Sequence, residues 1–315
     1  IIVSPGTYNG NVSFNGKNIT LRSTDPDNPA VVAATIIRGT GTTSVVKFTN
    51  KENSSCQLAG FTITGGAGAS SGGGIAGNNY DTSPTISQCI ITGNSTTSVG
   101  GGIYGCKGKI TRCVISNNST KFGGGLSACH GTIINCLIRN NQATNGNGGG
   151  IHNCDGSIIN CTITQNTVTG EGAIILCDGT MTNCIIWGNT PDTIVNSNCV
   201  ITYSCWPGGT SGTGNINTNP SFVSSSDFHL ATGSGCMDTG GEFLIYTDLD
   251  GNYRPQDGDR NGSEIVDMGA YEYPGFAKLI MTKPAGGETW VSGSKHRLEW
   301  ESVNYTGTID LSYSI

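Results

Sequence analysis

Residues 100–118 read GGGIYGCKGKITRCVISNN, residues 123–141 read GGGLSACHGTIINCLIRNN, and residues 148–166 read GGGIHNCDGSIINCTITQN. The second cysteine of each segment belongs to a series of five, spaced 24, 23, 25 and 23 residues apart: Cys89, Cys113, Cys136, Cys161 and Cys184. A nearly constant period of this length indicates stacked structural repeats. The rest of the chain is therefore interpreted relative to these units.

Apolar residues recur around each aligning cysteine in the manner of short strands rather than helices. Two residues after it stands an isoleucine, and three before it another apolar residue: Ile91, Ile115, Ile138, Ile163, Ile186, and Ile86, Ile110, Ile133, Ile158, Met181. Four units add an earlier cysteine with its own aliphatic residue three positions before: Cys106, Cys129, Cys154, Cys177, and Ile103, Leu126, Ile151, Ile174. Each unit is predicted to contain two or three short strands.

Glycine and asparagine are predicted to form the corners of each unit. Glycine triplets open the units at residues 72–74, 100–102, 123–125 and 148–150, with Glu171-Gly172-Ala173 in the fifth. Glycine permits positive φ and close backbone approach. Five residues after every aligning cysteine stands an asparagine, at Asn94, Asn118, Asn141, Asn166 and Asn189. Asparagine tolerates the left-handed conformation and can hydrogen-bond along a stack of identical turns.

These features predict an all-β fold, a right-handed parallel β-helix with about 23 to 25 residues per coil. Equivalent residues of successive coils would stack about 4.8 Å apart. The isoleucines and both cysteine sets would point inward, and the asparagines would form a ladder at one corner. In coil length, inward aliphatic stacks and asparagine ladder, the sequence resembles the pectin-lyase-like β-helix superfamily. The resemblance implies an architecture and not a reaction.

The predicted β-helix covers residues 1–273. Residues 1–55 are expected to form irregular first coils, residues 56–189 regular coils, and residues 190–273 C-terminal coils and a cap. Residues 1–8, IIVSPGTY, and 16–23, GKNITLRS, are similar to the first coils of many pectin-lyase-like proteins, and Phe61 takes the aligning position of the first regular unit.

Two further resemblances concern the end of the chain. GNINTNPSFV at 214–223, DFHL at 227–230, DLDGNYR at 248–254 and DMGAYEY at 267–273 follow in the order typical of surface proteins of the choice-of-anchor Q type. PAGGETW at 284–290, LEW at 298–300 and IDLSY at 309–313 resemble the start of a Ser/Thr-rich immunoglobulin-like cell-wall module. Residues 274–315 are therefore expected to form a linker and a truncated β-sandwich-like segment of a longer, extracellular, multidomain protein.

Composition limits the classes of partner. The formal net charge is −6, only 12% of residues are charged, and no run of Lys or Arg occurs, so nucleic acid is not an expected partner. No apolar run is long enough to cross a membrane, so direct membrane insertion of this segment is not expected. The thirteen cysteines sit at strand positions, where they are interpreted as free thiols filling the core. Pairing within a coil, such as Cys106 with Cys113, remains an alternative.

One set of candidate site residues follows the earlier cysteines. If those cysteines face inward, the next residues face outward and form one column on a strand face: Lys107, His130, Asp155 and Asp178. Tyr104, Arg139 and His152 would flank the column. It is open to three interpretations: a solvated polar face, a glycan-contact surface, or the catalytic site of a polysaccharide lyase or glycoside hydrolase, as in enzymes of the resembling superfamily.

A second set of candidate residues is acidic. Carboxylates and amides alternate around glycines near the C-terminus, a pattern that suits a hard cation such as Ca²⁺: Asp248, Asp250, Asn252, Asp257, Asp259, Asn261 and Asp267. A full EF-hand loop would need a glutamate where Met268 stands. The alternative is a polar turn that ties down the last coil without a metal.

These observations favour a non-catalytic, extracellular protein of the cell surface or matrix, with a structural or adhesin-like role. Its expected partners are glycans, other surface proteins or further copies of itself, and Ca²⁺ is the one cofactor suggested. The alternative is a polysaccharide lyase or glycoside hydrolase that uses the outward column.

Overall fold

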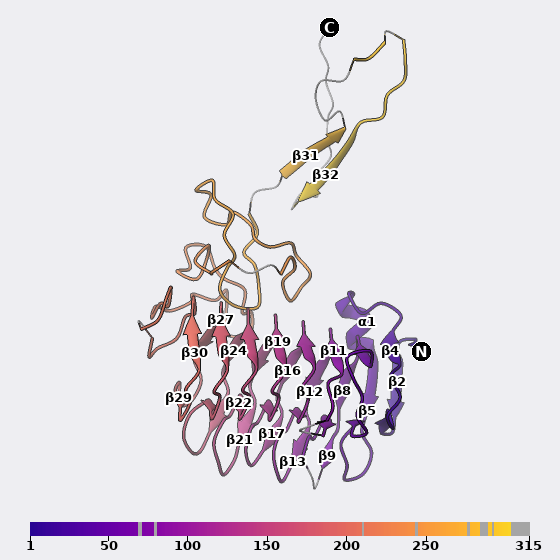
Figure 1. The fold of residues 1–315 in the computed structure, drawn as a ribbon, viewed down its shortest axis with the longest axis vertical. Coiled ribbons are helices and arrows are strands. Elements are labelled where there is room, and N and C mark those ends of the chain that lie inside the picture. The colour runs from indigo at the N-terminus through magenta and orange to yellow at the C-terminus, as the bar shows by residue number, and fades with distance from the viewer. Residues whose placement is uncertain are drawn as a thin grey trace.

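The computed structural model describes residues 1–68, 71–78, 81–209, 211–242, 245–275, 278–283, 289–291 and 293–303. In this part of the chain the protein is a parallel β-helix, as the sequence predicts (Figure 1). One short helix, α1 (Pro29–Ala34), interrupts the first coils. A small antiparallel sheet of β31 (Lys278–Lys283) and β32 (Glu299–Val303) follows. Residues 284–288 and 304–313 of the predicted immunoglobulin-like module lie outside the described residues.

Each regular coil passes through four parallel sheets, in the order first, second, fourth and third as they are numbered here. The first sheet contains β1 (Ile2–Val3), β4 (Thr20–Ser23), β7 (Gln57–Ala59), β11 (Thr85–Ser87), β15 (Lys109–Thr111), β19 (Thr132–Ile134), β23 (Ser157–Ile159), β27 (Thr180–Thr182) and β30 (Val200–Thr202). The second sheet contains β2 (Gly6–Asn9), β5 (Thr35–Arg38), β8 (Thr62–Thr64), β12 (Ile90–Thr92), β16 (Val114–Ser116), β20 (Leu137–Arg139), β24 (Thr162–Thr164) and β28 (Ile185–Trp187).

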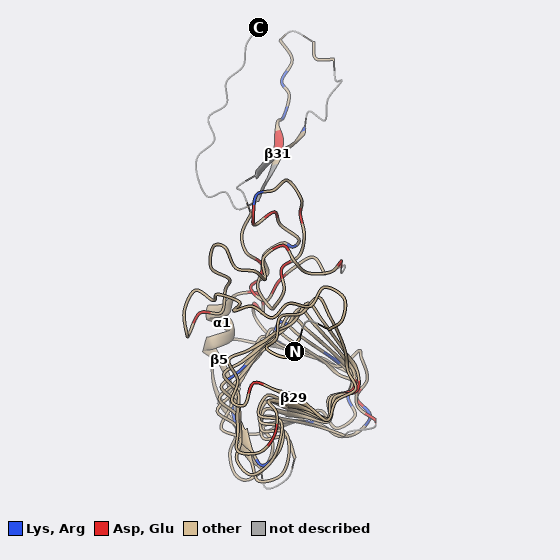
Figure 2. Ribbon diagram, turned by 90° about the vertical axis from the view of Figure 1, so that its left-hand side faces the viewer, with Lys and Arg blue, Asp and Glu red and all other residues tan. Residues whose placement is uncertain are grey.

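The other two sheets complete the coil. The third sheet contains β3 (Val12–Ser13), β6 (Val46–Phe48), β10 (Ile75–Gly77), β14 (Ile103–Tyr104), β18 (Leu126–Ser127), β22 (Ile151–His152), β26 (Ile174–Ile175) and β29 (Ile194–Val195). The fourth contains β9 (Ala67–Gly68), β13 (Ser95–Thr96), β17 (Ser119–Thr120), β21 (Gln142–Ala143) and β25 (Thr167–Val168). Seen along their stacking direction, the coils superimpose around one closed interior (Figure 2).

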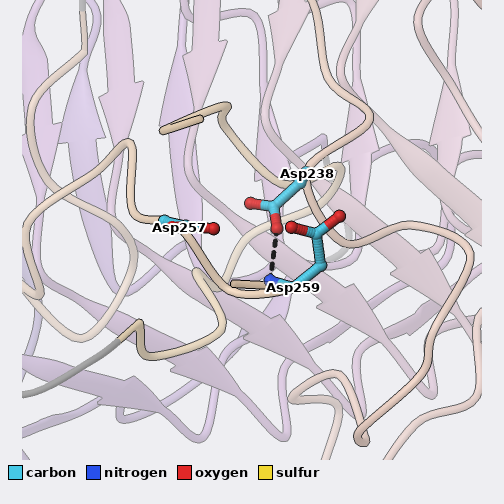
Figure 3. A group of neighbouring side chains, drawn as sticks. All are labelled: Asp238, Asp257 and Asp259. Carbon is cyan, nitrogen blue, oxygen red and sulfur yellow. Dashed lines mark hydrogen bonds between the residues drawn. The ribbon is translucent and has the colours of Figure 1, made fainter. Parts of the chain in front are cut away.

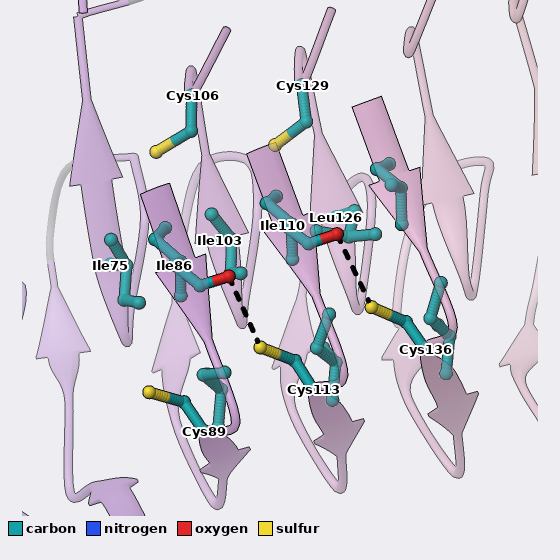
Figure 4. Close-up of a cluster of buried hydrophobic side chains, with 14 of the residues drawn as sticks. Ile75, Ile86, Cys89, Ile103, Cys106, Ile110, Cys113, Leu126, Cys129 and Cys136 are labelled. Carbon is teal, nitrogen blue, oxygen red and sulfur yellow. Dashed lines mark hydrogen bonds between the residues drawn. The ribbon is translucent and has the colours of Figure 1, made fainter. Parts of the chain in front are cut away.

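The core consists of the isoleucine and cysteine columns that the repeat predicts (Figure 4). In-register pairing stacks Ile110 between Ile86 and Ile133, and the aligning cysteines are fully buried next to them. The Sγ of Cys113 donates to the carbonyl of Ile86 at 3.7 Å. None of the thirteen cysteines, all within the described residues, is in a disulfide, and they pack as small apolar side chains. Burial raises the pKa of the Cys113 thiol, which keeps it protonated.

The asparagine ladder is present at the corner between the second and fourth sheets. The Nδ2 of Asn118 donates to the Oδ1 of Asn141 at 3.0 Å, and the Nδ2 of Asn141 donates to the Oδ1 of Asn166 at 3.0 Å. The residue in the left-handed conformation, however, is the one before the ladder position: Gly93, Asn117, Asn140, Gln165 and Gly188. That residue turns the chain, and the ladder asparagine points inward where its side chain can stack.

The glycine triplets have a steric reason. A Cβ on Gly124 would lie 2.3 Å from the carbonyl oxygen of Gly149 in the next coil. The first glycine of each triplet also has positive φ, for example 68° at Gly123. The first position thus needs a residue that tolerates positive φ and the second a residue without a Cβ, and glycine meets both requirements.

Residues 216–242 and 245–275, here called the C-terminal segment, run along the side of the coils rather than over their end (Figure 1). Several Asp and Glu residues lie in it (Figure 2). The segment binds the corner between the first and second sheets: the side chain of Asn183 exchanges two hydrogen bonds with the backbone of Gly241, and the Nδ2 of Asn135 donates to the Thr247 carbonyl. Beyond residue 189, β29 and β30 extend the coils, and parallel bridges continue the second sheet from Ile185 to Cys205 and from Cys205 to Ile216. Of the described residues, none forms a helix that is both long and apolar enough to cross a membrane.

Candidate functional site

The four residues of the outward column lie at the corner between the third and first sheets. Each follows a buried cysteine and precedes the glycine that leads into the first sheet: Lys107, His130, Asp155 and Asp178. Their spacing predicts a strand face, but the strands end earlier because the residue before each cysteine is left-handed: Gly105, Ala128, Asn153 and Leu176. The column is thus a turn, with Lys107, Asp155 and Asp178 exposed to solvent.

The acidic members of this column hydrogen-bond from coil to coil. His130 Nδ1 lies 3.1 Å from Asp155 Oδ2, and the backbone N–H of Asp178 donates to Asp155 Oδ1 at 3.2 Å. The backbone and side-chain N–H groups of Asn198 donate to Asp178 Oδ1 at 3.0 and 3.2 Å. The carboxylates therefore satisfy backbone donors of the next coil, much as the asparagine ladder does, and retain exposed oxygens that could accept from a ligand.

The three flanking residues are divided between two sheets. Tyr104 and His152 are in the third sheet, where the Nδ1 of His152 lies 3.1 Å from the Oγ of Ser127. Burial lowers the pKa of His152, so its ring is neutral at neutral pH. Arg139 is in the second sheet, where its guanidinium lies 5.6 Å from the ring of Phe228 in the C-terminal segment. The structure does not bring Arg139 to the column.

The acidic candidates separate into several local arrangements. Asp248 is fully buried, and its oxygens accept from the backbone N–H groups of Asn252 and Glu272 at 2.7 and 3.0 Å. Asp267 is also buried and accepts from the backbone of Asp238 at 2.7 Å. Asp248, Asn252 and Asp267 thus fix the loops of the C-terminal segment, and Asp250 lies elsewhere, beside His229.

Asp257 and Asp259 of the predicted set come together with Asp238 (Figure 3), and Asn261, also of that set, hydrogen-bonds to both Asp257 and Asp259. One carboxylate oxygen from each of the three lies within 4.8 Å of the others. Asp238 and Asp257 are buried, whereas Asp259 is exposed, so the group is open to solvent on one side. Burial, followed by the charges of its two neighbours, raises the pKa of Asp238.

The residues present fit a hard divalent cation. Backbone N–H groups of Gly258 and Asp259 donate to the two oxygens of Asp238 at 3.3 and 2.6 Å, and Asn261 donates to Asp257 and Asp259 at 3.0 Å each. These donors orient the carboxylates and leave each oxygen a second lone pair. Three carboxylates with an open side match the oxygen ligands, completed by water, that Ca²⁺ takes.

A buried ion pair lies behind this acidic cluster. The Nε of Arg254 donates to the Oε2 of Glu272 at 2.9 Å, and both side chains are fully buried. The guanidinium also donates to Asn135 Oδ1 at 3.3 Å and to the carbonyls of Asp267 and Gly269. Burial raises the pKa of Glu272 to about 7 despite the adjacent guanidinium. Arg254 therefore joins the C-terminal segment to the coils. Burial of its charge costs free energy, and its guanidinium is fully hydrogen-bonded.

A histidine is held between two carboxylates on the outer side of the same segment. His229 Nδ1 lies 2.5 Å from Asp227 Oδ1, and its Nε2 lies 2.9 Å from Asp250 Oδ2. The hydrogen bond with Asp250 is the main cause that raises the pKa of His229 to about 9, so the ring is charged at neutral pH. The ring packs against that of Tyr271, with centroids 4.0 Å apart and planes tilted by 35°. The ion pairs of His229 with Asp227 and with Asp250 thus join two loops.

Sequence reasoning missed Asp238, Asp227 and His229 as site residues. The spacing of Asp227 and His229, two apart around a buried Phe228, could have placed both on one face. No comparable signal marks Asp238, because it lies 19 residues before Asp257 in an irregular loop. Such loops bring distant residues together through tertiary contacts that no period reveals.

Comparisons with known proteins add little to this picture. No family model and no curated protein matches the chain. Among solved structures, a crystal structure of pectate lyase Pel9A is similar at 15% identity, with 86% of this chain and 87% of that chain covered and a TM-score of 0.44. A likeness at this level carries no argument about activity, and the β-helix described above is defined by its own strand pairing.

Proposed function

We propose that this protein is a non-catalytic, extracellular β-helix with a structural or adhesin-like role at a cell surface or in a matrix. The observation that supports this most is the hydrogen-bonded outward column. The carboxylates of Asp155 and Asp178 accept backbone N–H groups of the following coil, and His130 pairs with Asp155. Carboxylates that accept backbone hydrogen bonds in this way have a structural role that requires no substrate.

The function is tested by assaying turnover. The intact chain is incubated with acidic and neutral polysaccharides while unsaturated-uronate absorbance and reducing ends are measured, with His130→Ala in parallel. We expect no product above the buffer rate from either protein. Product formation that the His130→Ala substitution abolishes would establish the rival function, a polysaccharide lyase or glycoside hydrolase that uses this column. The same preparations, applied to cells, glycans and a sizing column, test adhesion and self-assembly.

Calcium is proposed as a stabilising ligand of the cluster formed by Asp238, Asp257 and Asp259. A cation held there would join two loops of the C-terminal segment that contain like charges. Ca²⁺ at about 100 times its Kd is expected to raise the free energy of unfolding by about 2.7 kcal/mol. Thermal unfolding with Ca²⁺, Mg²⁺ or a chelator measures the effect.

Matched variants make the calcium prediction specific. Asp259→Asn removes an exposed ligand and is expected to abolish the Ca²⁺-dependent shift, whereas Asp25→Asn, an exposed carboxylate on the coils, should leave it unchanged. The proposal is wrong if the midpoint of unfolding is the same with Ca²⁺ and with chelator, or if both variants respond like the parent protein.

A further inference from the structure

A large cleft lies where the last coil meets the C-terminal segment. Its volume is about 740 Å³, and its walls include Tyr203 from the coil and Glu242, Tyr246, Glu264 and Ile265 from the segment. Clefts of about 300–1,000 Å³ that combine apolar walls with a few polar groups are typical ligand sites. Neither the outward column nor the acidic cluster contributes to it.

Tyr203 has an unusual backbone for its size. It occupies the left-handed corner, with φ of 48°, that shorter or straight-chain polar residues occupy in earlier coils: Gln88, Arg112, Asn135, Asn160 and Asn183. A bulky residue rarely adopts this conformation. Its ring is accommodated by two glycines, since a Cβ on Gly214 or Gly241 would lie 2.3 or 2.6 Å from ring carbons. The local structure thus fixes an aromatic ring in the cleft wall, and such strain clusters at functional sites.

Two other residues of the lining leave apolar surface in water. Tyr246 is 58% exposed and Ile265 is 38% exposed, and neither belongs to the buried cluster that packs the segment against Ile185 of the coils. Together with Tyr203 they give the lining of one cleft aromatic and aliphatic surface. A tyrosine ring offers a flat apolar face and a polar hydroxyl, which suits a ligand with both kinds of surface.

The charges of the cleft exclude one class of ligand. Glu242 and Glu264 are both exposed at its walls, and the only cationic residue among those that line it, Arg254, is fully buried and donates to Glu272 and to backbone carbonyls. The exposed charged residues of the lining are thus acidic, which disfavours a polyanion such as a polyuronate. Groups that donate hydrogen bonds to carboxylates, such as hydroxyl or ammonium groups, are favoured.

We propose that this cleft binds a non-acidic saccharide, either a neutral sugar or an amino sugar. The carbon face of the sugar ring would lie on the exposed ring of Tyr246, while its hydroxyl or ammonium groups would donate to Glu242. This inference deepens the proposed adhesive role by naming a site and a ligand class. An enzyme that acts on acidic polysaccharides would prefer negatively charged ligands, whereas this cleft is predicted to prefer neutral or positively charged ones.

The test is calorimetric titration of the intact chain with three oligosaccharides of similar length: N-acetylglucosamine, glucosamine and galacturonate oligomers. One of the first two is expected to bind, and the galacturonate oligomer is not. Tyr246→Ala should weaken binding about tenfold or more, equivalent to about 1.4 kcal/mol, and Glu242→Gln should weaken it in the same direction. Tyr253→Ala is the matched control, because Tyr253 is 51% exposed in the same segment but does not line the cleft.

Each outcome of the titration either supports or overturns the proposed saccharide site. The inference is overturned if neither of the non-acidic oligomers binds, if galacturonate binds as well as they do, or if Tyr253→Ala weakens binding as much as Tyr246→Ala. Far-ultraviolet circular dichroism and the unfolding midpoint show that each variant is folded. If no oligosaccharide binds and no turnover occurs, only the proposed glycan site is rejected. If turnover occurs and depends on His130, the proposed non-catalytic function is rejected.

Discussion

Replacement of Arg254 by methionine is expected to lower the free energy of unfolding by about 4 kcal/mol, because it leaves the buried carboxylate of Glu272 without its counter-ion. Both side chains are fully buried, and the guanidinium also donates to Asn135 and to the carbonyls of Asp267 and Gly269. The loss should be greatest for attachment of the C-terminal segment. Chemical unfolding measures the energy, and limited proteolysis reports early cleavage within residues 216–275.

Two further proteins separate the ion pair from general damage. Arg38→Met alters an exposed arginine of β5 and should change stability by less than about 0.5 kcal/mol. The double variant Arg254→Met with Glu272→Leu removes both charges and should be more stable than Arg254→Met alone. A single variant that unfolds and is cleaved like the parent protein would show that Arg254 does not hold the segment.

Substitution of Asn141 by alanine is expected to cost about 3 kcal/mol, since it breaks the asparagine ladder in the middle of the coils. The Oδ1 of Asn141 accepts from the backbone and side-chain N–H groups of Asn118 at 3.1 and 3.0 Å. Its Nδ2 donates to the Ile115 carbonyl at 2.9 Å and to Asn166 at 3.0 Å. All these groups are buried, so water cannot replace the lost partner without opening the corner.

The adjacent residue provides the control for this ladder. Gln142→Ala changes an exposed side chain of β21 and should leave stability within about 0.5 kcal/mol of the parent. Urea unfolding of both variants measures the difference. If Asn141→Ala proves as stable as Gln142→Ala, the side-chain ladder contributes no net stability, and the stacked backbone alone holds the corner.

The coils were predictable because each contributing interaction repeats at a constant spacing. Ile115 and Cys113 lie at the inward positions that the alternation predicts, and Asn118 is in the ladder. The corner geometry was less predictable, since the left-handed residue is Asn117 and not the ladder asparagine. Two adjacent asparagines leave their roles ambiguous in the sequence, and the direction of the preceding strand decides which one points inward.

The candidate sites were only partly predictable. Lys107 and Asp155 occupy equivalent positions on different coils, as their spacing requires, but on a turn rather than a strand. In the C-terminal segment the sequence pattern grouped Asp248 with Asp257, whereas the chain path separates them and brings Asp238 to Asp257 and Asp259. Periodic stacking does not extend to this segment, so proximity there depends on irregular loops.

The amino-acid sequence by itself determined the parallel β-helix, its inward columns and its asparagine ladder. The reason is that a 23- to 25-residue period places each residue directly against the equivalent residue of the next coil. The spacing along the sequence therefore predicts which residues are in tertiary contact. Only the tertiary structure decided that the C-terminal segment lies along the coils, joined to them by Arg254 and Asn183. Those contacts link residues far apart in sequence, and so do the acidic cluster and the cleft, whose chemistry depends on how that segment folds back.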